Sequence, residues 1–144
     1  MHVLKLTAFD ADDLAVISAQ MQDAVILAGD IRYLKRAGKL VLIANRFAWD
    51  EAGEGSRTYR RRRSGLHFDR VRDVKAQRIR QDNPRAVLSL LAITFEPDEE
   101  PSGKIRLEFS GGGRIEASVE CIEAALDDLG PGWETAHMPS HETG

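Results

Sequence analysis

The sequence contains one cysteine and no long apolar run. Cys121 has no second cysteine to pair with, so no internal disulfide can form, which indicates a reducing compartment. The longest apolar runs, AVIL at 24–27 and LVLIA at 40–44, are far shorter than the roughly 20 residues of a membrane-spanning helix. The first residues show neither the basic segment nor the apolar segment of a signal peptide. We therefore expect a cytoplasmic protein that is not inserted in a membrane.

The sequence also lacks the residue patterns of metal and catalytic sites. His137 and His141 have the i, i+4 spacing of a helical metal-binding pair, but Pro139 lies between them, so we expect no helix there. Cys121 and His67 could act as nucleophile and base only if the fold brought them together, and no motif places them so. We predict no catalytic residue, no metal site and no cofactor.

What remains is the composition of an ordinary globular domain. Of the 144 residues, 42% are hydrophobic and 30% are charged, which excludes a fully disordered chain. This length is enough to build one hydrophobic core. We expect a single domain over residues 1–133 and a disordered tail over residues 134–144, where the sequence is polar and contains proline.

Charge is strongly separated along the chain. Residues 1–56 carry a net charge of −2, residues 57–85 carry +8 and residues 86–144 carry −9, which together give the overall −3. The weakly acidic total therefore conceals a basic middle segment and an acidic final third, which could pair with each other.

The first half of the chain predicts one helix and several strands. Leu14, Ile17 and Met21 recur at helical spacing, and Asp10 can cap the first turn, so we expect a helix from about 10 to about 23. Residues 30–50 predict two strands joined by a tight turn at RAGK, where Gly38 can adopt a positive φ.

Further along the chain the pattern remains that of strands. In the basic segment, Leu66 and Phe68 alternate as in a strand, whereas Val71 and Val74 break that parity, which indicates a bulge or bend near residues 69–73. Residues 104–120 show the cleanest alternation, with a triple glycine at the turn. That glycine run lacks the Lys-Ser/Thr of a phosphate-binding loop, so we interpret it as a hairpin turn.

A second helix is expected at residues 121–130, CIEAALDDLG, since its apolar residues recur at helical spacing and Gly130-Pro131 would terminate it. Cys121 would then lie near the start of this helix. Hairpins argue against a parallel fold, so we predict an α+β protein: a mainly antiparallel sheet curled into a partial barrel, with an N-terminal and a C-terminal helix. The element order resembles that of a pleckstrin-homology-like barrel. We expect one core made of Ile105, Leu107, Phe109, Ile115, Val119, Ile122 and Leu126.

Several blocks of the sequence carry a family resemblance. LKLTAFDADDL, NRFAWDE, RRRSGLHFDRV, LSLLAITFEP and GGGRIEASVECIEAALDDLGPGW, spread over roughly residues 3 to 133, are similar to a bacterial family known as domain of unknown function 2948. The resemblance implies a small cytoplasmic protein. The family has no assigned activity, so no site residues are carried over from it.

The candidate binding residues lie in the segment SRTYRRRRSGLHFDRV. Arginine presents a planar fork of donors that matches phosphate or carboxylate, so Arg60, Arg61, Arg62, Arg63 and His67 are the residues we select as a possible anion-binding surface. Neighbouring strand residues point to opposite faces, so two of the four arginines can share one surface. The alternative is a strand edge whose arginines lie in water or pair with the acidic final third.

Two classes of function follow from these residues. The first is a non-catalytic protein-interaction or small-ligand-binding module, with an acidic protein or a small anion as partner and with self-association as a homodimer. The second is a nucleic-acid-associated protein that uses residues 57–85. The sequence pI near 5.8 disfavours nucleic acid, because a basic domain is the usual footprint of such proteins. An enzyme ranks third, because no enzyme signature is found.

Overall fold

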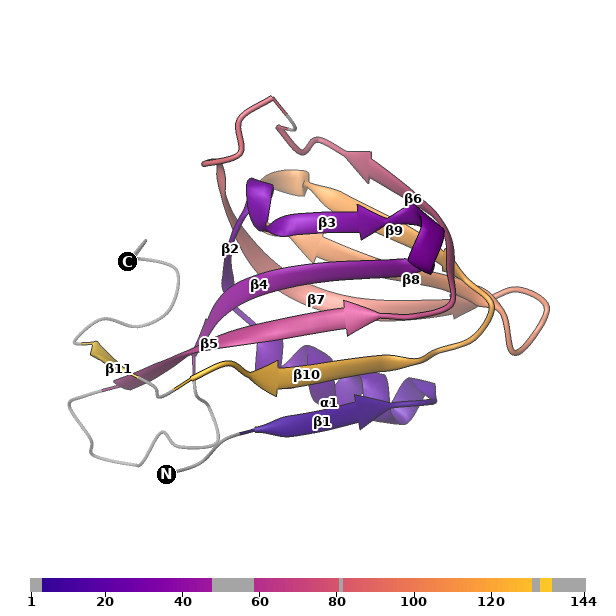
Figure 1. Cartoon of the computed structure of the whole chain (residues 1–144), viewed down its shortest axis with the longest axis horizontal. Helices are drawn as coiled ribbons and strands as arrows, with labels where there is room; N and C mark the ends of the chain where they lie inside the picture. The colour runs from indigo at the N-terminus through magenta and orange to yellow at the C-terminus, as the bar shows by residue number, and fades with distance from the viewer. Residues whose placement is uncertain (1–3, 48–58, 81, 131–132, 136–144) are drawn as a thin grey trace.

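A computed structural model describes residues 4–47, 59–80, 82–130 and 133–135 of the chain (Figure 1). The α-helix and the strands are β1 Lys5–Ala8, α1 Ala11–Met21, β2 Val25–Leu27, β3 Ile31–Leu34, β4 Lys39–Phe47, β5 Tyr59–Phe68, β6 Val71–Gln77, β7 Val87–Pro97, β8 Gly103–Phe109, β9 Arg114–Val119, β10 Ala124–Asp128 and β11 Trp133–Thr135. Short 3₁₀ helices occupy Ala28–Asp30 (η1), Lys35–Ala37 (η2) and Ser110–Gly112 (η3).

The strands form one antiparallel sheet that folds back on itself. Its order is β1-β10-β5-β4-β2-β7-β8-β9-β6, with β3 paired to β4 and β11 paired to β5. In Figure 1, β3, β4, β5, β10 and β1 make up a front layer, and β6, β9, β8 and β7 lie behind it. The short strand β2 pairs with both β4 and β7, so it links the two layers.

Helix α1 covers one side of the space between the layers. It packs against β7 of the back layer and β1 of the front layer (Figure 1). The side chain of Asp10 caps the helix by accepting a hydrogen bond from the Asp13 N–H at 2.8 Å, and Leu14, Ile17 and Met21 are buried. Among the described residues, no helix is long and apolar enough to cross a membrane.

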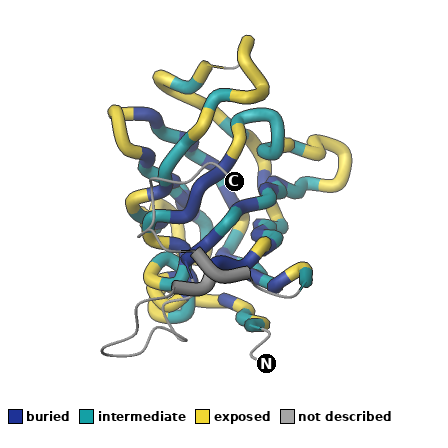
Figure 2. Tube along the Cα trace, turned by 90° about the vertical axis from the view of Figure 1, so that its left-hand side faces the viewer, coloured by how far each residue is buried: buried dark blue, intermediate teal, exposed yellow. Residues whose placement is uncertain are grey.

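The core fills the space between the two layers. All seven residues expected in one core belong to a single buried cluster, which confirms that prediction. The inward positions of β8 and β9 follow the predicted alternation, with Ile105, Leu107, Phe109, Ile115, Ala117 and Val119 buried. Figure 2 shows buried residues along the strands, with exposed residues at the turns and also alternating along some of the strands.

A predicted turn and a predicted strand irregularity are also confirmed. Gly38 ends the 3₁₀ turn between β3 and β4 with a φ of 61°, the conformation expected for RAGK. The pairing of β6 with β9 shifts register between Val71 and Asp73, which is the irregularity predicted from the broken alternation.

The predicted architecture, a partial barrel with a helix at each end, is wrong. The sheet does not close into a barrel, and within the described residues its outermost strands β1 and β6 are not paired to each other. Neither end of the described fold is helical. Strand β1 precedes α1, and the last described elements are the strands β10 and β11.

The C-terminal segment expected to be a helix contains strand β10. Ala124, Leu126 and Asp128 are buried on one side of it, which is an alternation of two rather than a helical stripe. The strand lies between β1 and β5 and pairs with both. These partners are distant in sequence, so their pairing overrides the helical preference of the local residues.

Candidate functional site

The arginine run lies in β5, and its members have different surroundings. Arg62 points inward with Leu66 and Phe68 and is completely buried, whereas Arg63 is exposed. Arg61 points to the opposite side from Arg62 and is also buried, and its Nη1 donates to the Asn45 carbonyl at 3.4 Å. The backbone of Arg60 pairs with Glu134, and its side chain lies outside the described residues. The four arginines therefore do not form one surface in water.

Arg62 belongs to a buried charged cluster around Asp128, at one end of the core. Arg46 donates to Asp128 through Nε at 3.0 Å and Nη2 at 2.9 Å, a bidentate pair. Ser64 Oγ and the Leu4 N–H donate to the same carboxylate at 2.7 and 2.8 Å. Arg62 Nε lies 3.9 Å from Asp128 Oδ2. An arginine of the basic segment is thus near an acid of the final third, although inside the protein and not on its surface.

The cluster holds Asp128 in its charged form. Burial by itself raises the pKa of Asp128, but the hydrogen bonds from Arg46, Ser64 and the Leu4 N–H, together with the Arg46 charge, outweigh burial and keep the pKa below its usual value. A carboxylate with these partners fixes the neighbouring strands β4, β5 and β10. We therefore assign the cluster to the architecture of the fold.

The other reactive side chains considered from the sequence are dispersed. His67 is partly buried on the outer face of β5, with Nε2 3.5 Å from Asp69 Oδ2. Cys121 lies in the connection between β9 and β10 and not at the start of a helix, where the sequence had placed it. In the part of the chain that the structure describes, no three His, Cys, Asp or Glu residues are grouped to hold a metal ion. His137 and His141 lie outside the described residues.

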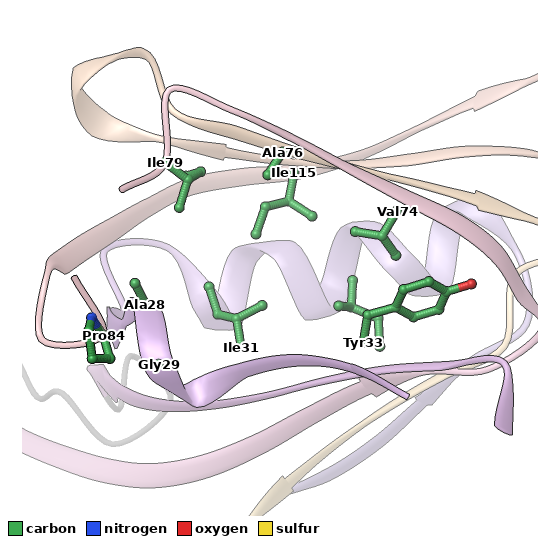
Figure 3. Close-up of a pocket in the computed structure, with 10 residues that line it drawn as sticks. Ala28, Gly29, Ile31, Tyr33, Val74, Ala76, Ile79, Pro84 and Ile115 are labelled. Atoms are coloured by element: carbon green, nitrogen blue, oxygen red, sulfur yellow. The ribbon is translucent and has the colours of Figure 1, made fainter. Parts of the chain in front are cut away.

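An apolar pocket lies where the two layers separate, between β3 and β6. Its volume is about 450 Å³, which lies in the range of roughly 300–1,000 Å³ usual for small-molecule sites. Ile31 and Tyr33 line it from β3, while Val74 and Ala76 line it from β6 (Figure 3). Leu40, Ile79, Ile115, Ala28, Gly29 and Pro84 complete the wall.

Each end of the pocket is closed by backbone contacts. At one end the Val71 N–H donates to the Gly38 carbonyl at 2.9 Å, which joins β6 to the β3–β4 turn. At the other end the Gly29 N–H donates to the Pro84 carbonyl at 2.8 Å. A Cβ atom at Gly29 would lie 2.8 Å from Pro84 Cβ, so glycine is required for this approach. The pocket is therefore a slot that is closed at both ends and open along its length.

The slot exists because two strands lack a partner on one side. Among the described strands, β3 pairs only with β4 and β6 pairs only with β9. Their facing edges diverge from the contact between Gly38 and Val71, and their apolar side chains fill the gap only in part. Ile31, Tyr33, Val74 and Ile79 remain partly accessible to solvent.

These pocket residues were not selected from the sequence. The alternation of Ile31 and Tyr33 with Arg32 and Leu34 predicts a strand, but it does not say that the strand borders a cavity. The other wall comes from β6 and the residues after it, which are brought near by pairing with β9. One feature of the sequence could have indicated this wall of the pocket: Ile79 is an apolar residue between two arginines of the basic segment.

Comparison with known proteins gives a family and nothing closer. Residues 4–141 match the family described as "Protein of unknown function (DUF2948)", so the chain belongs to that family, which confirms the resemblance seen in the sequence. No curated protein matches the chain. No solved structure matches it either.

Proposed function

We propose that this member of the DUF2948 family is a binding module for a small, largely apolar molecule, held in the slot between β3 and β6. The observation that supports this proposal most directly is the set of apolar side chains that β3 and β6 present to one cavity, at edges that no other described strand covers. Leaving such side chains in contact with water is unfavourable, and covering them yields about 25 cal/mol per Å² of apolar surface.

The chemistry of the lining supports binding rather than catalysis. Of the ten lining residues, Tyr33 is the one with a titratable side chain. A pocket for acid–base or nucleophilic chemistry would need at least a nucleophile and a base within hydrogen-bond reach of each other. The hydroxyl of Tyr33 gives a ligand one polar contact in an otherwise apolar wall.

A role for residues 57–85 in binding nucleic acid has less support. Arg61 and Arg62, at the centre of the arginine run, are buried, so they cannot follow a phosphate backbone in this conformation. The sequence-based expectations of an acidic protein partner, a cytoplasmic location and binding through Arg60–Arg63 and His67 stay predictions.

The proposed function is tested by filling the slot. Ala76 is exposed and its methyl group faces the cavity, so Ala76→Phe should occupy part of the volume without disturbing the core (Figure 3). We expect the neutral probe 1-decanol to shift amide resonances of β3 and β6 in NMR spectra of the full chain, and this binding to weaken at least about tenfold in the variant.

Ala15→Phe is the matched control, because Ala15 is exposed on α1, at the side of the fold opposite the slot. It should bind 1-decanol as the unmodified chain does. Equal binding by both variants, or no binding by the unmodified chain, would contradict the proposed function.

A further inference from the structure

The charged side chains beside the slot are mostly basic, which indicates the charge of its ligand. The two segments that form its lips, residues 28–36 and 71–86, contain eight basic and three acidic side chains, whereas the whole chain has a net charge of −3. The apolar slot of an acidic protein therefore opens between two basic segments.

Three of these cations lie near carboxylates of the protein itself. Arg72 lies 4.0 Å from Glu120, and Arg80 lies 3.9 Å from Asp82. Lys75 is the cross-strand neighbour of Glu116 and contributes to the lowered pKa of that carboxyl, after the hydrogen bond from Arg106. These side chains have acidic neighbours within the protein.

Of the five remaining cations, Lys35 and Arg36 do not adjoin a lining residue. Arg78 extends toward η3, where its Nη1 would lie 3.0 Å from a Cβ atom at Gly112.

Arg32 and Arg85 remain. Each is exposed and adjoins lining residues, since Arg32 lies between Ile31 and Tyr33 and Arg85 follows Pro84. Within the described part of the chain, neither has a carboxylate within the 4.0 Å of an ion pair. One stands on each lip, so a single anionic group at the mouth can approach both long, flexible side chains.

The slot itself does not suit a charge. Its wall offers the Tyr33 hydroxyl as the one polar side-chain group, and an ion placed among apolar side chains without a partner is strongly disfavoured. A charged group must therefore stay at the mouth while an apolar body fills the interior.

Resting on the proposed function, we infer that the slot takes an amphipathic anion, with an apolar chain or ring system inside and a carboxylate or phosphate group between Arg32 and Arg85. Carboxylates and phosphates share the property used here, which is a compact negative charge that accepts hydrogen bonds from guanidinium groups.

The test compares probes with one apolar chain and different head groups, titrated into the full-length protein and followed by calorimetry and NMR. The probes are decanoate, decyl phosphate, neutral 1-decanol and decyltrimethylammonium. We expect each anion to bind about tenfold more tightly than 1-decanol, and the ammonium probe more weakly than 1-decanol. The ratio between the two anions distinguishes a carboxylate from a phosphate ligand.

A double variant, Arg32→Gln with Arg85→Gln, should remove most of the anion preference and leave 1-decanol binding unchanged. Lys5→Gln with Lys104→Gln removes the same charge elsewhere and should keep the preference. Equal binding of decanoate and 1-decanol, or an anion preference unaffected by the Arg32 and Arg85 changes, would overturn this inference while leaving the proposed function intact. Absence of binding by every probe would contradict both.

Discussion

At the scale of the residue, Asp128 shows how burial changes the role of a charge. Its carboxylate is surrounded by Arg46, Ser64 and the Leu4 N–H and has almost no contact with water. An ion pair on the surface contributes about 0–1 kcal/mol, but removing one member of a buried pair leaves the other charge without compensation. The cluster therefore sets the geometry of three strands more than it adds net stability.

We expect Asp128→Asn to lower the free energy of unfolding by about 3–5 kcal/mol, because it removes the buried, bidentate ion pair between Asp128 and Arg46. Urea unfolding followed by circular dichroism measures this loss. Asp127→Asn is the control: Asp127 points to the other face of β10 and is half-buried, so its change should be within about 0.5 kcal/mol.

The same variant carries a second signature, in its dependence on pH. The pKa of Asp128 is lowered in the folded state relative to the unfolded value of about 3.9. Its stabilising contribution is therefore complete above the unfolded pKa and is lost as pH falls through the folded pKa. The stability difference between the unmodified chain and Asp128→Asn should shrink below about pH 4, and a difference that stays constant there would contradict the assignment.

At the scale of the element, β10 shows what local sequence cannot settle. The residues of CIEAALDDLG favour a helix by propensity and by the spacing of Ile122, Leu126 and Leu129. In the structure Ala125 lies directly between Thr7 of β1 and His67 of β5 as their cross-strand neighbour. The residues of one segment, read alone, do not reveal which distant strands will pair with it.

A pair of identical substitutions distinguishes strand from helix. We expect Ala125→Val to raise the free energy of unfolding by about 0.5 kcal/mol, because a β-branched residue suits a central strand with neighbours on both sides. Ala15→Val, on the exposed side of α1, should lower it by a similar amount, since valine is the poorer helix former. Urea titrations of both variants provide the measurement. Losses of equal size would contradict the assignment of β10.

The contrast between elements explains how far the sequence predicts this fold. Where alternation was complete, as in β8 and β9, the inward residues and the hairpin turn were predicted correctly. Where the partners were distant, as for β10, local preference predicted the wrong element. The slot belongs to the second case, because Tyr33 and Val74 meet only through the curl of the whole sheet. Likewise, no property of the arginine run itself indicated that Arg62 would be buried beside Asp128.

At the scale of the whole molecule, three exposed aliphatic side chains, Leu27, Val87 and Leu91, lie on the paired strands β2 and β7; we call them the apolar patch. Leu27 and Val87 are cross-strand neighbours on β2 and β7, and both are exposed. Leu91, four residues further along β7, is 49% exposed. Clustered exposed aliphatic side chains are typical of surfaces that contact another protein. We propose this patch as the contact surface of the homodimer predicted from the sequence.

We predict a homodimer at micromolar concentration, with twice the 16.0 kDa mass of the chain in sedimentation equilibrium. Val87→Asp should shift the population to the monomer, because a charge at the centre of a buried apolar contact is unfavourable. Leu129→Asp, at an exposed apolar residue outside the patch, is the control and should leave the mass unchanged. A single 16.0 kDa species for the unmodified chain would contradict the prediction.

The slot is closed at both ends, and this closure should make binding selective for ligand size. One end is closed by the contact of Gly38 with Val71, and the other by that of Gly29 with Pro84. Strand β3 has four residues, which corresponds to about 13 Å of extended chain. A ligand lying along the strand cannot extend past either end, so any excess length must leave through the open side into water. Each methylene that enters the slot contributes about 0.8 kcal/mol, and each one outside contributes nothing. Affinity in a homologous series should therefore rise with chain length to a limit and then level off, so that the slot acts as a molecular ruler.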